Sequence, residues 1–228
     1  MIPTTPPRAE LPDPATTAPP ERAALQWYLR LVRHHLGRGP YLDVAGSGGA
    51  LLAGLTRLGP ASGLAGSDAE ADAMRHGAPG CPVYRGVDAL PAPAASLTAV
   101  EVLDRLPDAG LDGDTGPGGW FRALEPGGHA LVVAADAEGR GRQLSGARWV
   151  PPRVPRGHVR IREILVEAGF EIVREGSDGL TRGPYGGVPA WADPRTAPAR
   201  AQRSAGRLTL EAGAGERAVI IARRPRPS

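Results

Sequence analysis

The residues best placed to do chemistry follow a short apolar segment near the start of the chain. Residues 41–45 (YLDVA) are expected to form a buried strand, and a helix is expected to begin at Ala50. The turn between them consists only of small residues: Ala45, Gly46, Ser47, Gly48 and Gly49. Small residues let a ligand approach the backbone closely, and amide groups at the start of a helix favour an anionic group. The pattern therefore predicts a ligand-binding turn.

Two carboxylates and a histidine are candidate bases elsewhere in the chain. Glu101 ends an apolar segment that reads as a strand, and Asp104 follows it closely. His158 begins a later amphipathic helix. Ligands bind at the carboxyl ends of the strands in open α/β sheets, so Glu101 and Asp104 could take a proton from a bound substrate. His158 is a third candidate, because the ordinary pKa of histidine suits a general base. The alternatives are that Asp104 stabilises a helix start through the helix dipole and that His158 faces solvent.

Strands and helices alternate along most of the chain. The hydrophobic patterns predict strands at 41–45, 62–66, 82–86, 96–101, 129–135, 170–173 and 217–223, with helices at 21–36, 50–58, 69–76, 120–124 and 158–169. Such alternation indicates βαβ units, and therefore an α/β fold with a mostly parallel sheet and helices on both faces. The last two strands suggest a β-hairpin that completes the sheet.

Length and composition indicate one folded domain. The chain has 228 residues, of which 41% are hydrophobic and only 4% aromatic. Residues 1–20 are rich in Pro and Thr and are expected to be a disordered leader, whereas 21–228 form the domain. Within it, 177–215 reads as a long irregular loop or lid, and loops of this length are usually functional.

Charge and cysteine content exclude several classes of function. The chain has no lysine, which rules out Schiff-base chemistry and the lysine of a phosphate-binding P-loop. A net charge of +3 is too small to indicate a nucleic-acid partner, and a lone Cys81 can form neither an internal disulfide nor a metal site by itself. No signal peptide and no apolar run of about 20 residues is visible. We expect a cytoplasmic protein with a small-molecule substrate and no metal; the sequence leaves the oligomeric state open.

The turn resembles the first motif of the class I S-adenosylmethionine-dependent methyltransferases. In the segment LDVAGSGG (42–49), Asp43 and Gly49 match that motif, and Ala45 and Ser47 replace glycines. The resemblance implies S-adenosylmethionine as the cofactor. It also assigns cofactor binding to Asp43, Ala45, Gly46, Ser47 and Gly49.

Later segments are similar to the same family in the same order. LEPGG (124–128) is similar to the turn before the fifth strand, and EAGFEIV (167–173) to the passage into the sixth. ALP (89–91) and VLDRLP (102–107) resemble the third and fourth motifs. The resemblance covers about residues 21–224. It implies a Rossmann-like seven-stranded sheet, mostly parallel and flanked by helices, whose last strand is antiparallel.

The resemblance also implies two acidic residues that bind the adenosine part of the cofactor. The acidic residue that binds the ribose hydroxyls ends the second strand in this family. One alignment register places Ala65 there and the other places Asp68, which we favour. The acidic residue that binds the adenine amino group aligns with Gly86, and Asp88 lies two residues later. Asp68 and Asp88 are therefore the predicted ligands at these positions.

The leading prediction is methyl transfer to an O or N atom of a small molecule of specialised metabolism. The alternative is a protein of this fold that no longer methylates, either a cofactor-independent cyclase-type enzyme or a partner-binding subunit. The replaced motif residues favour that alternative. A nicotinamide dehydrogenase fits poorly, because Gly-x-Gly-x-x-Gly counted from Gly46 places Leu51 at the third glycine.

Overall fold

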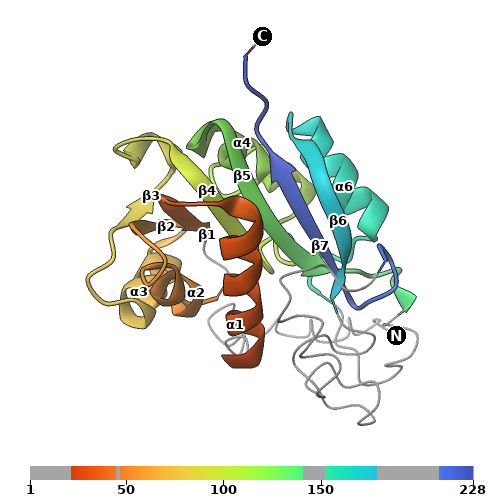
Figure 1. Ribbon diagram of the computed structural model, residues 1–228, viewed down its shortest axis with the longest axis horizontal. Helices are drawn as coiled ribbons and strands as arrows, with labels where there is room; N and C mark the ends of the chain where they lie inside the picture. Colours follow the sequence, from red (N-terminus) through yellow and green to blue (C-terminus); the bar gives the residue numbers. More distant parts are fainter. Residues whose placement is uncertain (1–21, 45–46, 141–151, 179–210, 228) are drawn as a thin grey trace, which may run out of the picture.

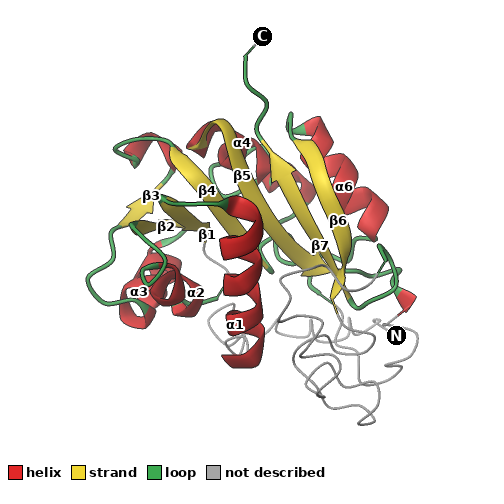
Figure 2. Ribbon diagram, viewed as in Figure 1, coloured by secondary structure: helices red, strands yellow, loops and turns green. Residues whose placement is uncertain are grey.

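The computed structural model describes residues 22–44, 47–140, 152–178 and 211–227. A seven-stranded sheet in the order β3-β2-β1-β4-β5-β7-β6 lies between two layers of helices (Figures 1 and 2). Helix α1 crosses the front of the sheet in Figure 1, and α4 and α6 lie behind it. The predicted leader 1–20 lies outside the described residues, as does most of the predicted loop at 177–215.

The elements follow one another in the predicted alternation. The strands are β1 (Tyr41–Val44), β2 (Ala61–Ala65), β3 (Val83–Arg85), β4 (Ala94–Val100), β5 (Leu124–Ala135), β6 (Glu171–Asp178) and β7 (Arg217–Arg223). The α-helices are α1 (Arg22–Leu31), α2 (Ala50–Leu55), α3 (Asp68–Gly77), α4 (Pro117–Ala123) and α6 (His158–Glu167). A π-helical turn, η2 (Val32–Leu36), extends α1, and the short 3-10 helices η3 (Val87–Ala89) and η4 (Asp108–Gly110) follow β3 and β4.

The strand directions confirm the predicted fold class. Strands β1 to β5 pair in parallel. Strand β7 is antiparallel to both of its neighbours, β5 and β6. The predicted closing hairpin is thus present, with β7 inserted between β5 and the edge strand β6.

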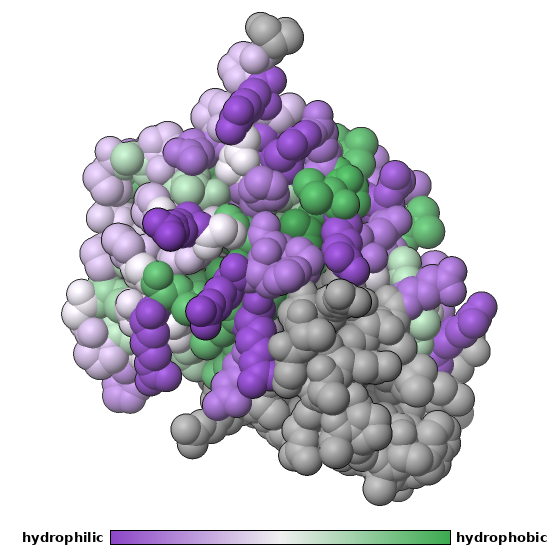
Figure 3. Space-filling model, viewed as in Figure 1, coloured by the Kyte–Doolittle hydropathy of each residue, from purple (hydrophilic) through white to green (hydrophobic). Residues whose placement is uncertain are grey.

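Alternation along the strands explains how both faces of the sheet are buried. In β5, Leu131 and Val133 pack with α1 and α2, whereas Ala130 and Val132 pack with α4 and α6. Successive side chains of a strand point to opposite faces, so a strand covered on both sides must be apolar throughout. Figure 3 shows hydrophilic residues along the outer face of α1 and a hydrophobic patch over β6 and β7.

The structure corrects the bounds of two strands. Strand β5 begins at Leu124, before the predicted start at His129, because a register shift against β4 accommodates the Pro-Gly-Gly segment within the strand. Strand β6 continues to Asp178, beyond the predicted end at Val173, because it pairs with β7 along this whole length. As an edge strand it carries exposed polar side chains, so its hydrophobic pattern stops early.

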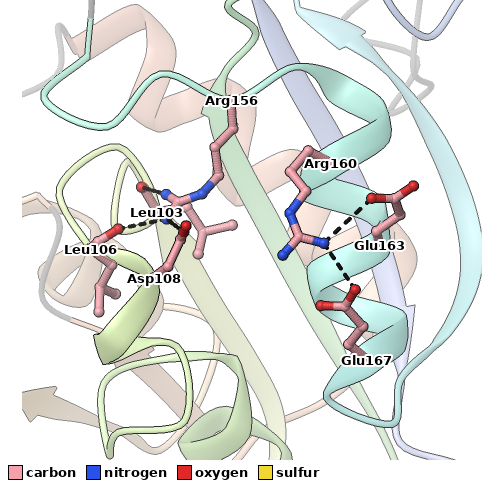
Figure 4. Close-up of polar contacts among 7 residues, drawn as sticks. All are labelled: Leu103, Leu106, Asp108, Arg156, Arg160, Glu163 and Glu167. Atoms are coloured by element: carbon pink, nitrogen blue, oxygen red, sulfur yellow. Dashed lines mark hydrogen bonds and ion pairs between the residues drawn. The ribbon is translucent and has the colours of Figure 1, made fainter.

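A buried arginine fixes the segment that follows β4 (Figure 4). The Arg156 side chain, 5% exposed, donates hydrogen bonds to the carbonyl oxygens of Leu103 (2.6 Å) and Leu106 (2.8 Å) and to Oδ1 of Asp108 (2.7 Å). This ion pair holds the pKa of Asp108 below its ordinary value. The segment before α6 also donates from the Val154 amide to the Asp104 carbonyl oxygen, 2.9 Å away. The backbone of the candidate base Asp104 is therefore held from outside its own loop.

Candidate active site

The carboxyl ends of the parallel strands meet at one edge of the sheet, and the antiparallel strand β7 begins there. Glu101 directly follows β4, and Arg217 is the first residue of β7. Arg217 donates a hydrogen bond from Nη2 to Oε1 of Glu101 across 3.2 Å, and their side chains are 18% and 17% exposed. The reversal of β7 therefore places a cation beside the carboxylate that follows β4.

The backbone of Glu101 is in the left-handed region, with φ 60°. Residues other than glycine rarely adopt this conformation, which costs of the order of 1 kcal/mol or more of conformational free energy. The Glu101 amide donates to the Val133 carbonyl oxygen (2.7 Å), and its carboxylate is held by Arg217. Together these contacts maintain the strained conformation at the edge of the sheet.

Asp104 is a partly exposed carboxylate of the same edge. Its Oδ1 accepts a hydrogen bond from the Ala135 amide at the end of β5, 2.8 Å away. Burial, and then the negative charge of Glu101, raise its pKa from 3.8 to about 6. The pKa of Asp104 therefore approaches neutral pH, which suits a general base.

Asp43 lies in β1, directly before the predicted ligand-binding turn. Its Oδ1 accepts a hydrogen bond from the Thr98 hydroxyl in β4 (2.7 Å), and among the described residues Oδ2 has no hydrogen-bond partner. Burial raises the pKa of Asp43 from 3.8 to about 7. The Thr98 hydroxyl and the Leu52 backbone amide of α2 offset part of this rise, so the Asp43 carboxyl group connects β1 with both β4 and α2.

The described part of the turn leads from β1 into α2, the strand–turn–helix arrangement expected from the sequence. Ser47 is buried, and its Oγ accepts a hydrogen bond from the Leu51 amide in α2 (3.1 Å). Gly49 has φ 86°, and a Cβ atom there would lie 2.6 Å from the Met74 carbonyl oxygen. Only glycine fits that contact with α3. Ala45 and Gly46, the other predicted cofactor residues of the turn, lie outside the described residues.

The structure places His158 between α6 and the end of the sheet. Its amide donates to Oδ1 of Asp136 (3.1 Å), and its Nε2 lies 3.2 Å from Oε2 of Glu175 in β6. The side chain is buried. His158 thus joins α6 to β6 and to the residue that follows β5, and within the described part of the chain it is hydrogen-bonded to neither Glu101 nor Asp104.

The predicted adenosine ligands lie on the surface. Asp68 is the first residue of α3; its side chain is 93% exposed and forms an ion pair with Arg85. Asp88 lies in η3 and is also exposed. Ala65, the other candidate, is the last residue of β2 and is buried.

Another carboxylate lies at the end of β2, and the sequence reading did not include it. Oε2 of Glu70 accepts a hydrogen bond from the Gly66 amide (2.9 Å), and its Oε1 lies 3.5 Å from Nη1 of Arg105. The Glu70 amide donates to Oγ of Ser67, the N-cap of α3. The S-x-x-E spacing of a capping box would have signalled that this side chain folds back over the helix start.

The Gly-rich turn after η4 covers the ends of β2 and β3. A Cβ atom added to Gly86 would lie 2.6 Å from Oδ2 of Asp114, and one added to Gly66 would lie 3.1 Å from Thr115. Oδ1 of Asp114 accepts a hydrogen bond from Arg122 (3.1 Å). No local sequence signal connects Asp114 with Gly86, because the contact joins separate loops.

Comparison with known proteins identifies the fold. One similar solved structure is a possible histamine N-methyltransferase from Thermotoga maritima, with TM-score 0.57 and 16% identity over 89% of this chain and 90% of that chain. Another is the N-methyltransferase NodS from Bradyrhizobium japonicum WM9 in complex with S-adenosylhomocysteine, with TM-score 0.56 and 16% identity over 92% and 90%. This chain has the class I S-adenosylmethionine-dependent methyltransferase fold.

The methyltransferase fold is not tied to a single reaction. The [4+2]-cyclase SpnF is also similar, with TM-score 0.57 and 19% identity over 92% of this chain and 84% of that chain. No family model and no curated protein matches the sequence. At these identities the likeness establishes the fold, and the chemistry has to be argued from the site.

Two further findings bound what the described residues can do. Among them, no group of three or more His, Cys, Asp or Glu side chains is placed to hold a metal ion. None of their helices is long and apolar enough to cross a membrane. Glu101 and Asp104, which follow β4 at the carboxyl edge of the sheet, form the candidate active site.

Proposed function

We propose that this protein is an enzyme that binds S-adenosylmethionine and transfers its methyl group to an oxygen or nitrogen atom of a small molecule. The observation that carries the proposal is the pair of carboxylates Glu101 and Asp104 at the carboxyl edge of the sheet. This edge is where open α/β sheets bind ligands. The similarity to methyltransferases, including one with S-adenosylhomocysteine bound, supports the same reading.

The residues around the β1 turn fit the proposed cofactor. Asp43 lies just before the turn, and among the described residues its Oδ2 forms no hydrogen bond of good geometry, so an amino or hydroxyl group of a ligand could donate to it. Among the described residues, no heavy atom lies within 4 Å of a Cβ atom added to Gly48, so none of them fills that side of the turn. Asp43 and the turn at 45–49 would hold the cofactor, with the carboxylates after β2 and β4 completing an edge suited to a cationic sulfonium.

When bound, S-adenosylmethionine supplies an electrophilic methyl carbon, and the protein then chiefly aligns the acceptor and removes its proton. Asp104 is the base in this proposal, because its raised pKa of about 6 lets it accept a proton near neutral pH. The Ala135 amide fixes one of its oxygens. Glu101 acts through charge, since its carboxylate contributes to the raised pKa of Asp104 while Arg217 holds it in place.

Calorimetric titration with S-adenosylmethionine and S-adenosylhomocysteine tests the binding step. We expect micromolar dissociation constants for both ligands. Turnover is then tested by incubating the protein with S-adenosylmethionine and a panel of small hydroxyl- and amine-bearing compounds, and detecting a mass increase of one methylene. Absence of binding at millimolar ligand would exclude the proposed function.

A second function is favoured by one specific observation. Strand β2 ends at Ala65 and Gly86 follows β3, so neither strand end has the acid that the family resemblance expects there. A protein of this fold without methyl transfer, such as a cofactor-independent cyclase or a partner-binding subunit, would need neither acid. The same titration separates the proposals, because this second function predicts that the wild-type protein does not bind the cofactor.

A further inference from the structure

The ends of β2 and β3 lack acidic side chains of their own, yet carboxylates occupy both places. Ala65 ends β2 and Gly86 follows β3. Glu70 reaches the end of β2 from α3, and Asp114 reaches the end of β3 from the Gly-rich turn before α4. Two separate elements thus deliver carboxylates to neighbouring strand ends.

Glu70 is held firmly over the end of β2. The Gly66 amide donates to its Oε2, and Arg105, from the segment after β4, pairs with its Oε1. The side chain is 33% exposed, so it is anchored without being sealed from solvent. By contrast, Asp68 points into solvent with Arg85 as its partner.

Asp114 occupies the space that a side chain at position 86 would need. Its Oδ2 lies 2.6 Å from the Cβ position of Gly86, while Arg122 binds its Oδ1. Gly86 also has φ 87°, a conformation that other residues rarely adopt. The Asp114 carboxylate can therefore occupy this place only because residue 86 is a glycine.

We propose that Glu70 and Asp114 bind the nucleoside part of the ligand, Glu70 through the ribose hydroxyls and Asp114 through the amino group of the base. The assignment rests on the proposed function. Vicinal hydroxyls present two donors, which a carboxylate can accept together, and an exocyclic amine is a donor to a single carboxylate oxygen. Arg105 must release Oε1 of Glu70 for both oxygens to accept.

Charge-removing variants and matched ligands test each contact separately. Glu70→Gln keeps an oxygen for the Gly66 amide, and Asp114→Asn keeps one for Arg122, so both variants are designed to retain the fold. Binding of S-adenosylhomocysteine, measured by calorimetry, is expected to weaken about 10- to 100-fold in each, the usual effect of losing a hydrogen bond to a charged group.

Ligand analogues show whether the loss comes from the assigned contact. Wild-type protein should discriminate against the 2′-deoxyribose analogue and against S-inosylhomocysteine, whose base carries an oxo group in place of the amine. Glu70→Gln should lose only the first preference, and Asp114→Asn only the second. Asp72→Asn in α3 and Asp112→Asn in the turn are matched exposed controls and should bind like the wild type. Thermal melting without ligand checks that every variant is folded.

The outcomes separate this assignment from the proposed function. If the wild type does not bind S-adenosylhomocysteine, both are wrong. If the wild type binds and the Glu70 and Asp114 variants keep its affinity and preferences, only the assignment is wrong. Weakening by Asp68→Asn or Asp88→Asn in place of Glu70→Gln or Asp114→Asn would also overturn it and favour the ligands predicted from the sequence.

Discussion

At the level of single residues, Asp104 lies in the fields of a carboxylate and a guanidinium. The charge of Glu101 raises its pKa, and the charge of Arg217 lowers it. If Asp104 is the base, the rate of methyl transfer should rise with pH through about 6 and then level off. Glu101→Gln should move that midpoint to lower pH, and Arg217→Gln should move it to higher pH. The pH dependence of kcat/KM measures both shifts.

Asp104→Asn provides the reference for this prediction. The variant keeps the oxygen that accepts from the Ala135 amide but cannot take a proton, so turnover should fall about 10²- to 10⁴-fold and lose its dependence near pH 6. Cofactor affinity should change little. Shifts of the same sign in Glu101→Gln and Arg217→Gln would contradict the electrostatic coupling.

Asp43 should make the protein less stable as the pH rises. Its pKa is raised to about 7 in the folded protein and is near 3.8 in an ordinary environment. The folded state therefore favours the protonated form, and this contribution, complete below about pH 4, is lost as the pH rises toward 7. The loss is at most about 1.4 kcal/mol per pH unit for one such group.

Asp43→Asn tests this directly, because asparagine is neutral at every pH and can still accept from Thr98. The difference in free energy of unfolding between the variant and the wild type should grow in favour of the variant between pH 4 and 7. Urea denaturation at several pH values measures it. A difference independent of pH would show that Asp43 titrates normally.

The sequence predicts the residues of the site that lie next to a strand end. Glu101 is predicted in this way from its place after an apolar segment, and the resemblance to the first methyltransferase motif adds Asp43 and Ser47. The proposed roles of Glu70 and Asp114 have no such local signal, since α3 and the turn before α4 carry them to strand ends that precede them in the chain. This contact between separate loops also means that placing an acid at the end of β3 by Gly86→Asp should not create a cofactor ligand there. The new side chain would collide with Asp114, and its backbone would be strained.

At the level of elements, Arg156 should decide the stability of the segment after β4. Arg156→Ala removes the donors of two backbone carbonyls, those of Leu103 and Leu106, and should lower the free energy of unfolding by about 2–3 kcal/mol. Arg156→Lys should recover only part of this, because an ammonium cannot form the guanidinium's fork of hydrogen bonds. Thermal or urea unfolding measures both variants.

The exposed partner of Arg156 provides the control. Asp108→Asn leaves both carbonyls satisfied, and the Asp108 side chain is 78% exposed, so the stability should hardly change. An equal loss in Asp108→Asn and Arg156→Ala would show that the ion pair, and not the backbone contacts, holds the segment. No local sequence pattern predicts this role, because Arg156 lies in an irregular segment and its partners are about 50 residues earlier in the chain.

The bounds of a strand could be predicted from the sequence where its side chains are buried along its whole length. Strand β7, apolar through residues 218–222, has the bounds expected from the sequence, Arg217–Arg223. The edge strand β6 was predicted too short because Arg174 and Glu175 interrupt its apolar pattern. Hydrogen bonding to β7, which no local pattern reports, determines where β6 ends.

At the level of the whole molecule, ligand binding should stabilise the fold. A ligand that binds only the folded state at 100 times its Kd adds about 2.7 kcal/mol. For a domain of this size, that corresponds to a rise in Tm of roughly 5–10 °C. Differential scanning calorimetry with increasing S-adenosylhomocysteine should show Tm rising with concentration, whereas homocysteine alone should have little effect. A constant Tm would contradict the proposed cofactor.

The position of β7 has a consequence for how the chain folds. His129 of β5 pairs with Arg223, and β6 pairs with the sheet through β7, so both pairings on this side of the sheet wait for β7, which lies near the end of the chain. Pairings between residues this far apart in sequence form late, because the chain entropy lost on closing the loop comes first. During synthesis, β1 to β5 can assemble while β5 still has an open edge. That open edge is where premature association between nascent chains would begin.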